Sequence, residues 1–151
     1  MRDNYTTEER VALVTKLRER FLEQRERFEE YLVLLEQQES AIAEGDTEAL
    51  GRYVEMESRI IEDIAAVQRV VTPLSEVYRS VTDEPDPEIL ELSESLTTLH
   101  REVSRRNLKN QELLRNGIDT LRQEIATLSR PQRTVNVYSN RGTGTLLDIS
   151  T

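Results

Sequence analysis

In the stretch ESAIAEGDTEAL, residues 39–50, only Gly45 and Asp46 separate two long amphipathic segments. Gly45 suits the left-handed conformation that commonly ends a helix, and Asp46 is a preferred residue for starting the next one. A connection this short forces the second helix to run antiparallel to the first. The sequence therefore predicts a helical hairpin.

The first helix of this hairpin is predicted over residues 6–44. It opens on the sequence TTEE at residues 6–9, a capping box in which threonine and glutamate side chains bond free backbone amides. Its apolar residues recur every seven positions, as in a coiled coil: Val14, Phe21, Phe28, Leu35 and Ile42. Gln24 and Gln38 fall at intermediate positions of this seam, where we expect them to weaken it.

The second helix is predicted over residues 46–81, because its apolar residues are spaced by threes and fours. Pro73 lies inside it, removes one hydrogen bond and crowds the preceding turn, so we expect a kink or a break. The linker TDEPDPE, residues 82–88, follows. Within it Asp86 can cap a third helix that begins at residue 87, with Pro87 at its first position, and ends at about residue 129.

The third helix carries two apolar series with different registers. The first comprises Ile89, Leu92, Leu96, Leu99 and Val103, and the second comprises Leu114, Ile118, Leu121, Ile125 and Leu128. Between them, in SRRNLKNQE at residues 104–112, Asn107 and Asn110 stand where the seam should be apolar. This offset of about four residues is a stutter, and it predicts that the helix presents two faces. The asparagines either fix the register of the bundle or meet another protein.

Composition places the chain among proteins built from long helices. It has 151 residues, 32% of them charged and only 5% aromatic, without tryptophan. We therefore expect one domain over residues 1–129, an all-α, elongated antiparallel three-helix bundle or coiled coil. Residues 130–151 are expected to form a flexible tail, extended or disordered, because Pro131 stops the helix and VNVYSNRGTG at 135–144 alternates and then breaks on glycines.

Several classes of function are excluded at this stage. A net charge of −9 disfavours nucleic acid and anionic membrane as partners. No apolar run is long enough for a signal peptide or a membrane span, which indicates a cytoplasmic protein without membrane insertion. His100 is the only histidine and lacks a glutamate three residues before it, and no phosphate-binding or nucleophile motif occurs. We therefore expect no enzyme activity, no metal and no cofactor.

Three segments, in this order along the chain, resemble the FlgN-type flagellar export chaperones. They are LLEQQESAIAEGDTEALGRYVEMESRIIEDI at residues 34–64, NLKNQELLRNGIDTLRQEIATL at 107–128 and VYSNRGTG at 137–144. The resemblance implies a small acidic protein that binds the C-terminal helices of the hook–filament junction proteins FlgK and FlgL. It also implies that the protein delivers them to FlhA, the export gate of the flagellar type III secretion apparatus.

The same resemblance implies which residues act. The cargo-binding face would comprise Asn110, Leu114, Ile118, Leu121, Ile125 and Leu128. Tyr138 would dock on the export gate. Two alternatives stay open. The chain could be a structural coiled-coil protein that self-associates, for example as a homodimer, or a regulatory module that binds an unrelated helix.

Overall fold

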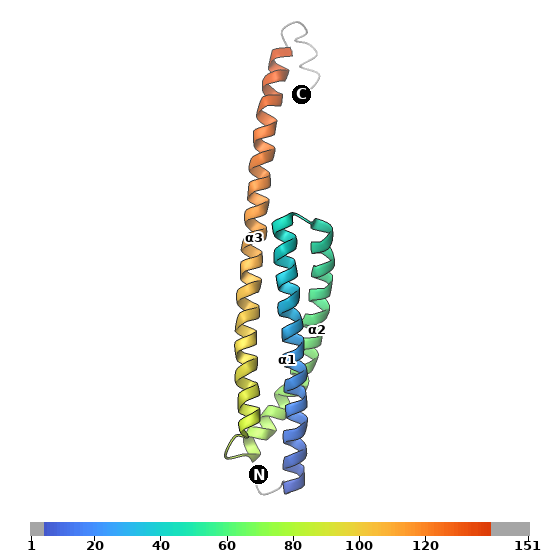
Figure 1. Cartoon of the computed structure of the whole chain (residues 1–151), viewed down its shortest axis with the longest axis vertical. Coiled ribbons are helices and arrows are strands. Elements are labelled where there is room, and N and C mark those ends of the chain that lie inside the picture. The colour runs from blue at the N-terminus through green and yellow to red at the C-terminus, as the bar shows by residue number, and fades with distance from the viewer. Residues whose placement is uncertain (1–4, 140–151) are drawn as a thin grey trace. The chain divides into compact units, whose positions relative to one another are not determined.

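The computed structural model describes residues 5–139, and the side chains of residues 5–128. It contains the helices α1 (Thr7–Glu44), α2 (Thr47–Val81) and α3 (Pro87–Ser139), and no strand occurs in the described range (Figure 1). The chain divides into an N-terminal unit, Met1–Gln111, and a C-terminal unit, Glu112–Thr151. Helix α3 contributes to both. The predicted all-α class is confirmed, and the boundary falls at the end of the predicted stutter.

The ends of α1 form as the sequence predicts. The Thr6 hydroxyl accepts a hydrogen bond from the Glu9 N–H at 3.1 Å, and the Glu9 carboxylate accepts one from the Thr6 N–H at 2.8 Å. Gly45 ends the helix with φ of 70°, in the left-handed region that favours glycine. The Asp46 carboxylate then accepts from the Ala49 N–H at 3.0 Å and caps α2. These local bonds fix the hairpin turn.

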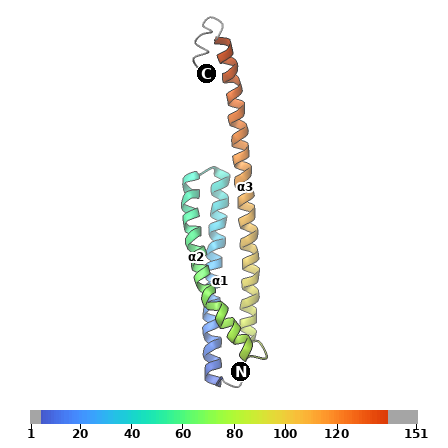
Figure 2. The ribbon, with the colours of Figure 1, turned by 180° about the vertical axis from the view of Figure 1, so that it is seen from behind.

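Side-chain contacts give the directions of the helices in the N-terminal unit. Between α1 and α2, the Gln24 amide donates to Gln68 at 2.7 Å, and the Gln38 amide donates to Glu57 at 2.9 Å. From the first pair to the second, the residue number rises on α1 and falls on α2, so these two helices are antiparallel (Figures 1 and 2).

Helix α3 runs the other way relative to α2. Arg18 pairs with Glu88 at 3.3 Å, and the Tyr31 hydroxyl accepts from the Asn107 amide at 2.9 Å. From the first pair to the second, the residue number rises on α1 and also on α3, so this part of α3 is parallel to α1. The N-terminal unit is therefore a three-helix arrangement of up, down and up.

The core of the N-terminal unit follows the predicted seam, except that its two glutamines do not weaken it. Phe21, Phe28 and Leu35 are buried, while Val14 and Ile42 are half-buried. The remaining large members of the core come from all three helices: Leu17, Tyr31, Val67, Val71, Tyr78, Ile89, Leu92, Leu96 and Val103. Gln24 and Gln38 were expected to weaken the seam, but both are buried and hydrogen-bonded to α2. A buried amide with a partner carries little penalty.

Pro73 bends α2 without breaking it. The helix is continuous from Thr47 to Val81 with Pro73 inside, and Figure 2 shows it changing direction toward its C-terminal end. Proline leaves the carbonyl four residues earlier without its usual donor. Next to it, the Thr72 hydroxyl donates to the Gln68 carbonyl at 3.0 Å, a bond that also favours bending.

The end of α3 differs from the prediction. The sequence predicted a helix to about residue 129 and an extended or disordered tail over 130–151, whereas α3 reaches Ser139. Pro131 does not end α3, because a proline inside a helix removes only one intrahelical hydrogen bond, and α2 likewise continues through Pro73. Residues 140–151 lie outside the described part of the chain.

Candidate partner-binding face

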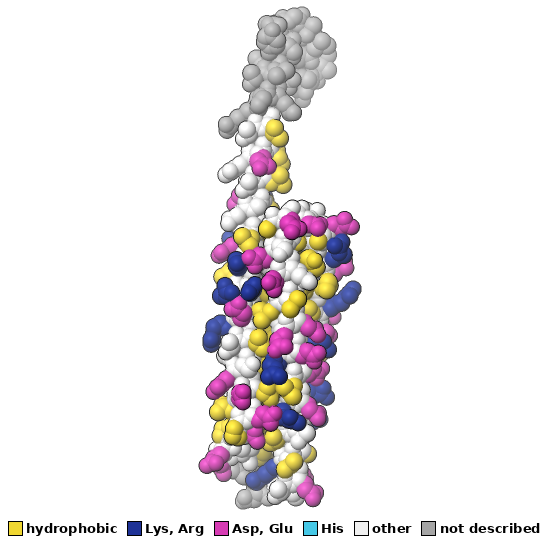
Figure 3. Space-filling view, in the orientation of Figure 1, with side chains coloured by type: hydrophobic (Ala, Val, Ile, Leu, Met, Phe, Trp, Pro, Cys, Tyr) yellow, Lys and Arg dark blue, Asp and Glu magenta, His cyan; other side chains and the backbone are white. Residues whose placement is uncertain are grey.

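The C-terminal unit carries a stripe of exposed apolar side chains on α3. We call it the apolar stripe, and it consists of Leu114, Ile118, Leu121, Ile125 and Leu128. Their exposed fractions rise along the chain from 41% at Leu114 to 67% at Leu128. At about 100° per residue, the five side chains share an arc of roughly 80° and extend along roughly 21 Å of helix. Figure 3 shows hydrophobic side chains aligned on one side of this helical segment.

Earlier in α3, a similar series of apolar residues is buried because α1 and α2 pack against it. In the N-terminal unit, Ile89, Leu92, Leu96 and Val103 follow one another at three, four and seven residues and are all buried in the core shared with α1 and α2. The apolar stripe has the same residue types at similar spacing, yet every member is exposed. Contiguous apolar side chains on a surface commonly mark an interaction site. Burying each of these side chains fully would be worth about 1.5–3 kcal/mol, compared with leaving it exposed.

Asn110, which the sequence grouped with this face, lies elsewhere. It is only 5% exposed and belongs to the N-terminal unit, where its amide donates to the Leu35 carbonyl at 2.9 Å and to Gln38 at 3.5 Å. Its side-chain oxygen is buried and accepts no hydrogen bond from a described residue. These contacts favour the alternative reading of Asn110 as a residue that fixes the register of the bundle.

Asn107 has a comparable position and bonds to Tyr31, which is buried in α1. Burial and the neighbouring Glu57 carboxylate raise the pKa of Tyr31 to about 12, although the Asn107 amide, by donating to its oxygen, acts in the opposite direction. The two asparagines therefore attach α3 to α1 just before the boundary between the units.

Surface ion pairs join α3 to α1 and also connect neighbouring residues within α3. Glu39 of α1 accepts from Lys109 at 2.9 Å and lies 3.8 Å from Arg106, and Lys109 lowers the pKa of the Glu39 carboxyl. Hydrogen bonds from Arg105 and then Arg106 lower the pKa of Glu102 to about 2. Because these groups are exposed to water, each pair contributes little to stability.

The rim of the apolar stripe contains residues that the sequence reasoning missed. Arg115 and Arg122 are seven positions apart and lie roughly 80–100° around the helix from Leu114, on one flank of the stripe. Glu124 lies on the other flank, roughly 80° from Leu114 in the opposite sense. The signal in the sequence was the seven-residue spacing of two arginines directly beside an apolar series.

His100, the lone histidine, packs against an aromatic ring of α1. Its ring meets Phe28 edge-on, with centroids 5.9 Å apart and planes at 80°, and the residue is exposed. Among the described side chains, those of residues 5–128, no group of three or more His, Asp or Glu is placed to hold a metal ion. In the same range, no helix combines the length and apolar character needed to cross a membrane.

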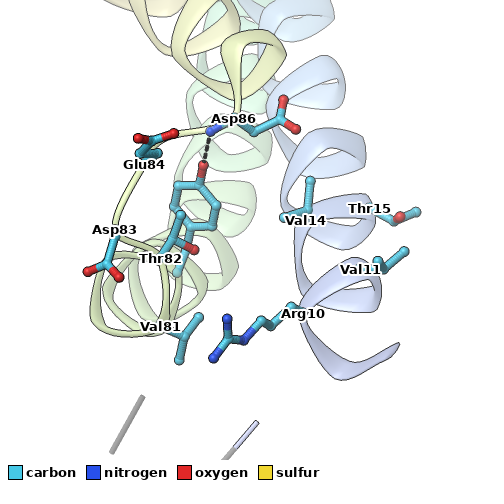
Figure 4. Close-up of a pocket in the computed structure, with 10 residues that line it drawn as sticks. Arg10, Val11, Val14, Thr15, Val81, Thr82, Asp83, Glu84 and Asp86 are labelled. Atoms are coloured by element: carbon cyan, nitrogen blue, oxygen red, sulfur yellow. Dashed lines mark hydrogen bonds between the residues drawn. The ribbon is translucent and has the colours of Figure 1, made fainter. Parts of the chain in front are cut away.

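A hollow of about 790 Å³ lies at the base of the N-terminal unit, between the start of α1 and the linker to α3. Figure 4 shows that the Asp83, Glu84 and Asp86 carboxylates around it do not converge on one point. Asp86 is occupied structurally, because its N–H donates to the Tyr78 hydroxyl at 2.6 Å and its carboxylate caps α3. Asp86 therefore stabilises the linker and the start of α3.

Tyr138 lies in the last turns of α3, where side chains are outside the described part of the structure. Its assignment to gate docking therefore stays a prediction.

Comparisons with known proteins cover both units. The model of the family described as FlgN protein matches residues 13–145, which include the apolar stripe. An uncharacterized protein of Treponema pallidum (strain Nichols) is 32% identical over 141 residues, which are 93% of this chain and 91% of that protein. No solved structure matches the chain.

Proposed function

This chain belongs to the FlgN family of flagellar export chaperones, and on that premise we propose that its cargo is the C-terminal helices of FlgK and FlgL. In the proposed cycle, the protein binds these hook–filament junction proteins in the cytoplasm and prevents their premature assembly. It then delivers them to FlhA, the gate of the type III export apparatus. Its action is stoichiometric binding rather than catalysis.

The observation that carries this proposal is the exposed apolar stripe from Leu114 to Leu128. Its residues lie at the spacing that an amphipathic helix uses to dock against another helix. Since the side chains are already half-exposed on a formed helix, a cargo helix can bury them without unfolding the N-terminal core. Affinity would come from this burial, while charged residues at the rim would set specificity and salt dependence.

The rival proposal is self-association through the same stripe. A second copy of the chain would bury the same leucines and isoleucines and give a homodimer, in which the stripe is a structural seam. A regulatory module that binds an unrelated helix would use the stripe in the same way as a chaperone. These three proposals differ in the identity of the occupant, so binding measurements separate them.

The test is a calorimetric titration of the full chain with C-terminal peptides of FlgK and FlgL from the same genome. We expect one-to-one binding, and we expect Leu121→Asp to weaken it at least tenfold, equivalent to 1.4 kcal/mol. Gln123→Asp is the matched control, because Gln123 is exposed on the opposite side of the same helix. Absence of peptide binding, together with a dimer that Leu121→Asp dissociates, would establish the self-association seam instead.

Delivery to the gate is tested separately with Tyr138→Ala. This variant should keep its affinity for the cargo peptides and lose binding to the cytoplasmic domain of FlhA. Loss of cargo binding in Tyr138→Ala, with FlhA binding intact, would contradict the division of roles between stripe and tyrosine.

A further inference from the structure

We infer that the helix bound by the apolar stripe carries carboxylates along one flank, facing Arg115 and Arg122, and that it approaches α3 most closely at Gly117. This inference rests on the proposed function, because it specifies the chemistry of the proposed cargo helix. It is carried by two independent features of the C-terminal unit, the charges on the two flanks of the stripe and the position of a helical glycine.

The first feature is the unpaired charge of the two arginines. Neither Arg115 nor Arg122 forms an ion pair with another described residue, although Asp119 lies within one turn of both on the helix. In the N-terminal unit, some half-buried arginines of α1 pair with glutamates at helical spacing, as in Arg20 with Glu23 and Arg27 with Glu30, whereas the exposed Arg101 likewise forms no ion pair with a described residue.

A partner that covers the stripe also removes water from the adjoining flank. A guanidinium that loses water needs an acceptor, and a carboxylate gives the strongest hydrogen bonds to it. The opposite flank carries Glu124, which would repel a row of carboxylates. The two flanks therefore allow an acidic-sided helix to dock in only one orientation about its own axis.

The second feature is Gly117, which lies in the middle of a helix. Glycine there destabilises the helix by about 0.5–1 kcal/mol relative to alanine. A Cβ atom at this position would meet nothing within 4 Å, so no described neighbour requires a glycine. Gly51 in α2 is equally uncrowded, and empty space alone therefore does not mark a contact.

What distinguishes Gly117 is its place at the edge of the apolar stripe. Leu114 precedes it by three residues and Leu121 follows it by four, and these are the neighbours of a helical residue on its own face. The missing side chain leaves a notch between two exposed leucines. Because the distance between packed helices depends on the side chains at the contact, a glycine lets a second backbone come closer there.

The charge half of the inference is tested with two synthetic amphipathic helical peptides. Both have leucines on one face, and one carries glutamates on one flank where the other carries glutamines. The full chain should bind the glutamate peptide at least fivefold more tightly at low salt. The double variant Arg115→Gln, Arg122→Gln should lose this preference, while Arg101→Gln, an exposed arginine of the N-terminal unit, should keep it. Equal binding of both peptides by the unmodified chain would overturn the inference.

The glycine half is tested with a matched pair of substitutions, using the glutamate peptide. Gly117→Ala and Gly51→Ala should both raise the thermal midpoint, since neither Cβ meets a neighbour. Only Gly117→Ala should weaken peptide binding, by fivefold or more. If Gly117→Ala binds the peptide as tightly as the unmodified chain, the bound helix does not approach α3 closely at Gly117.

Leu121→Asp separates failure of the inference from failure of the proposed function. If it abolishes binding of both peptides while the flank and glycine variants change nothing, the stripe binds helices but the inference is wrong. If neither peptide binds the unmodified chain and FlgK and FlgL peptides also fail, both are wrong.

Discussion

Replacing Asn110 tests the packing of α3 against α1. The side chain is buried, its amide nitrogen donates hydrogen bonds, and its oxygen accepts none from a described residue. Asn110→Leu removes the bond to the Leu35 carbonyl, which costs about 1 kcal/mol, since that carbonyl keeps its acceptor role within α1. It also removes the buried oxygen that has no described donor, whose desolvation costs about 1–3 kcal/mol. Added apolar burial of about 1.5–3 kcal/mol offsets the extra volume, which costs about 1–3 kcal/mol.

The net expectation for Asn110→Leu is a gain of about 1 kcal/mol in the free energy of unfolding. With a urea slope of about 2 kcal/mol per molar, the midpoint of unfolding followed by circular dichroism rises by roughly 0.5 M at unchanged slope. Asn110→Asp gives the opposite result near pH 7, because it buries a carboxylate beside the Leu35 carbonyl and the Gln38 oxygen.

The pH dependence of Asn110→Asp has a defined sign. Burial beside two acceptors raises the pKa of the introduced carboxyl above its ordinary value of about 4. The difference in stability from the unmodified protein should therefore be small below pH 4 and should grow as the pH rises through the raised pKa. A loss of more than about 1 kcal/mol in Asn110→Leu, with Asn110→Asp neutral at pH 7, would show that the buried amide stabilises the packing of α3 against α1.

Three further predictions follow from single residues. Leu35→Ala should lower the free energy of unfolding by about 2–5 kcal/mol in urea titrations, while Val33→Ala, at an exposed neighbour, should change it by less than about 0.5 kcal/mol; equal effects would contradict the assigned core. Tyr31 should stay neutral to about pH 12 in absorbance titrations at alkaline pH, and because the unfolded chain ionises near pH 10, stability should fall between these values; a Tyr31→Phe spectrum that keeps the highest step would contradict this. Gly45→Ala should lower the thermal midpoint, because its φ is 70°, whereas Gly51→Ala should raise it; a shift of the same sign in both would show that the turn is not strained by a side chain.

The hairpin could be predicted from sequence because its determinants are local. The capping box, the left-handed glycine and the aspartate cap each act within one turn of helix, and the structure has all three. The seam residues Phe21, Phe28 and Leu35 were predictable for a related reason, since heptad spacing places them on one side of α1 whatever their partner is.

Features that depend on a second helix were not predictable in this way. Spacing placed Gln24 and Gln38 on the seam, but their hydrogen-bond partners lie on α2 and become neighbours only after the hairpin closes. The family resemblance grouped Asn110 with the apolar stripe, and only its contact with α1 shows that it is buried. Pro131 was interpreted as a helix stop, although a proline inside a helix costs a bond without always ending it.

Amide hydrogen exchange of the full chain, with and without the FlgK C-terminal peptide, would show where the proposed cargo helix binds. We expect slower exchange over residues 112–128 in the complex and unchanged exchange over residues 34–64 of the hairpin. Slower exchange in the hairpin without change at 112–128 would contradict this expectation. So would a free chain in which residues 112–128 are already as protected as the buried centre of α1.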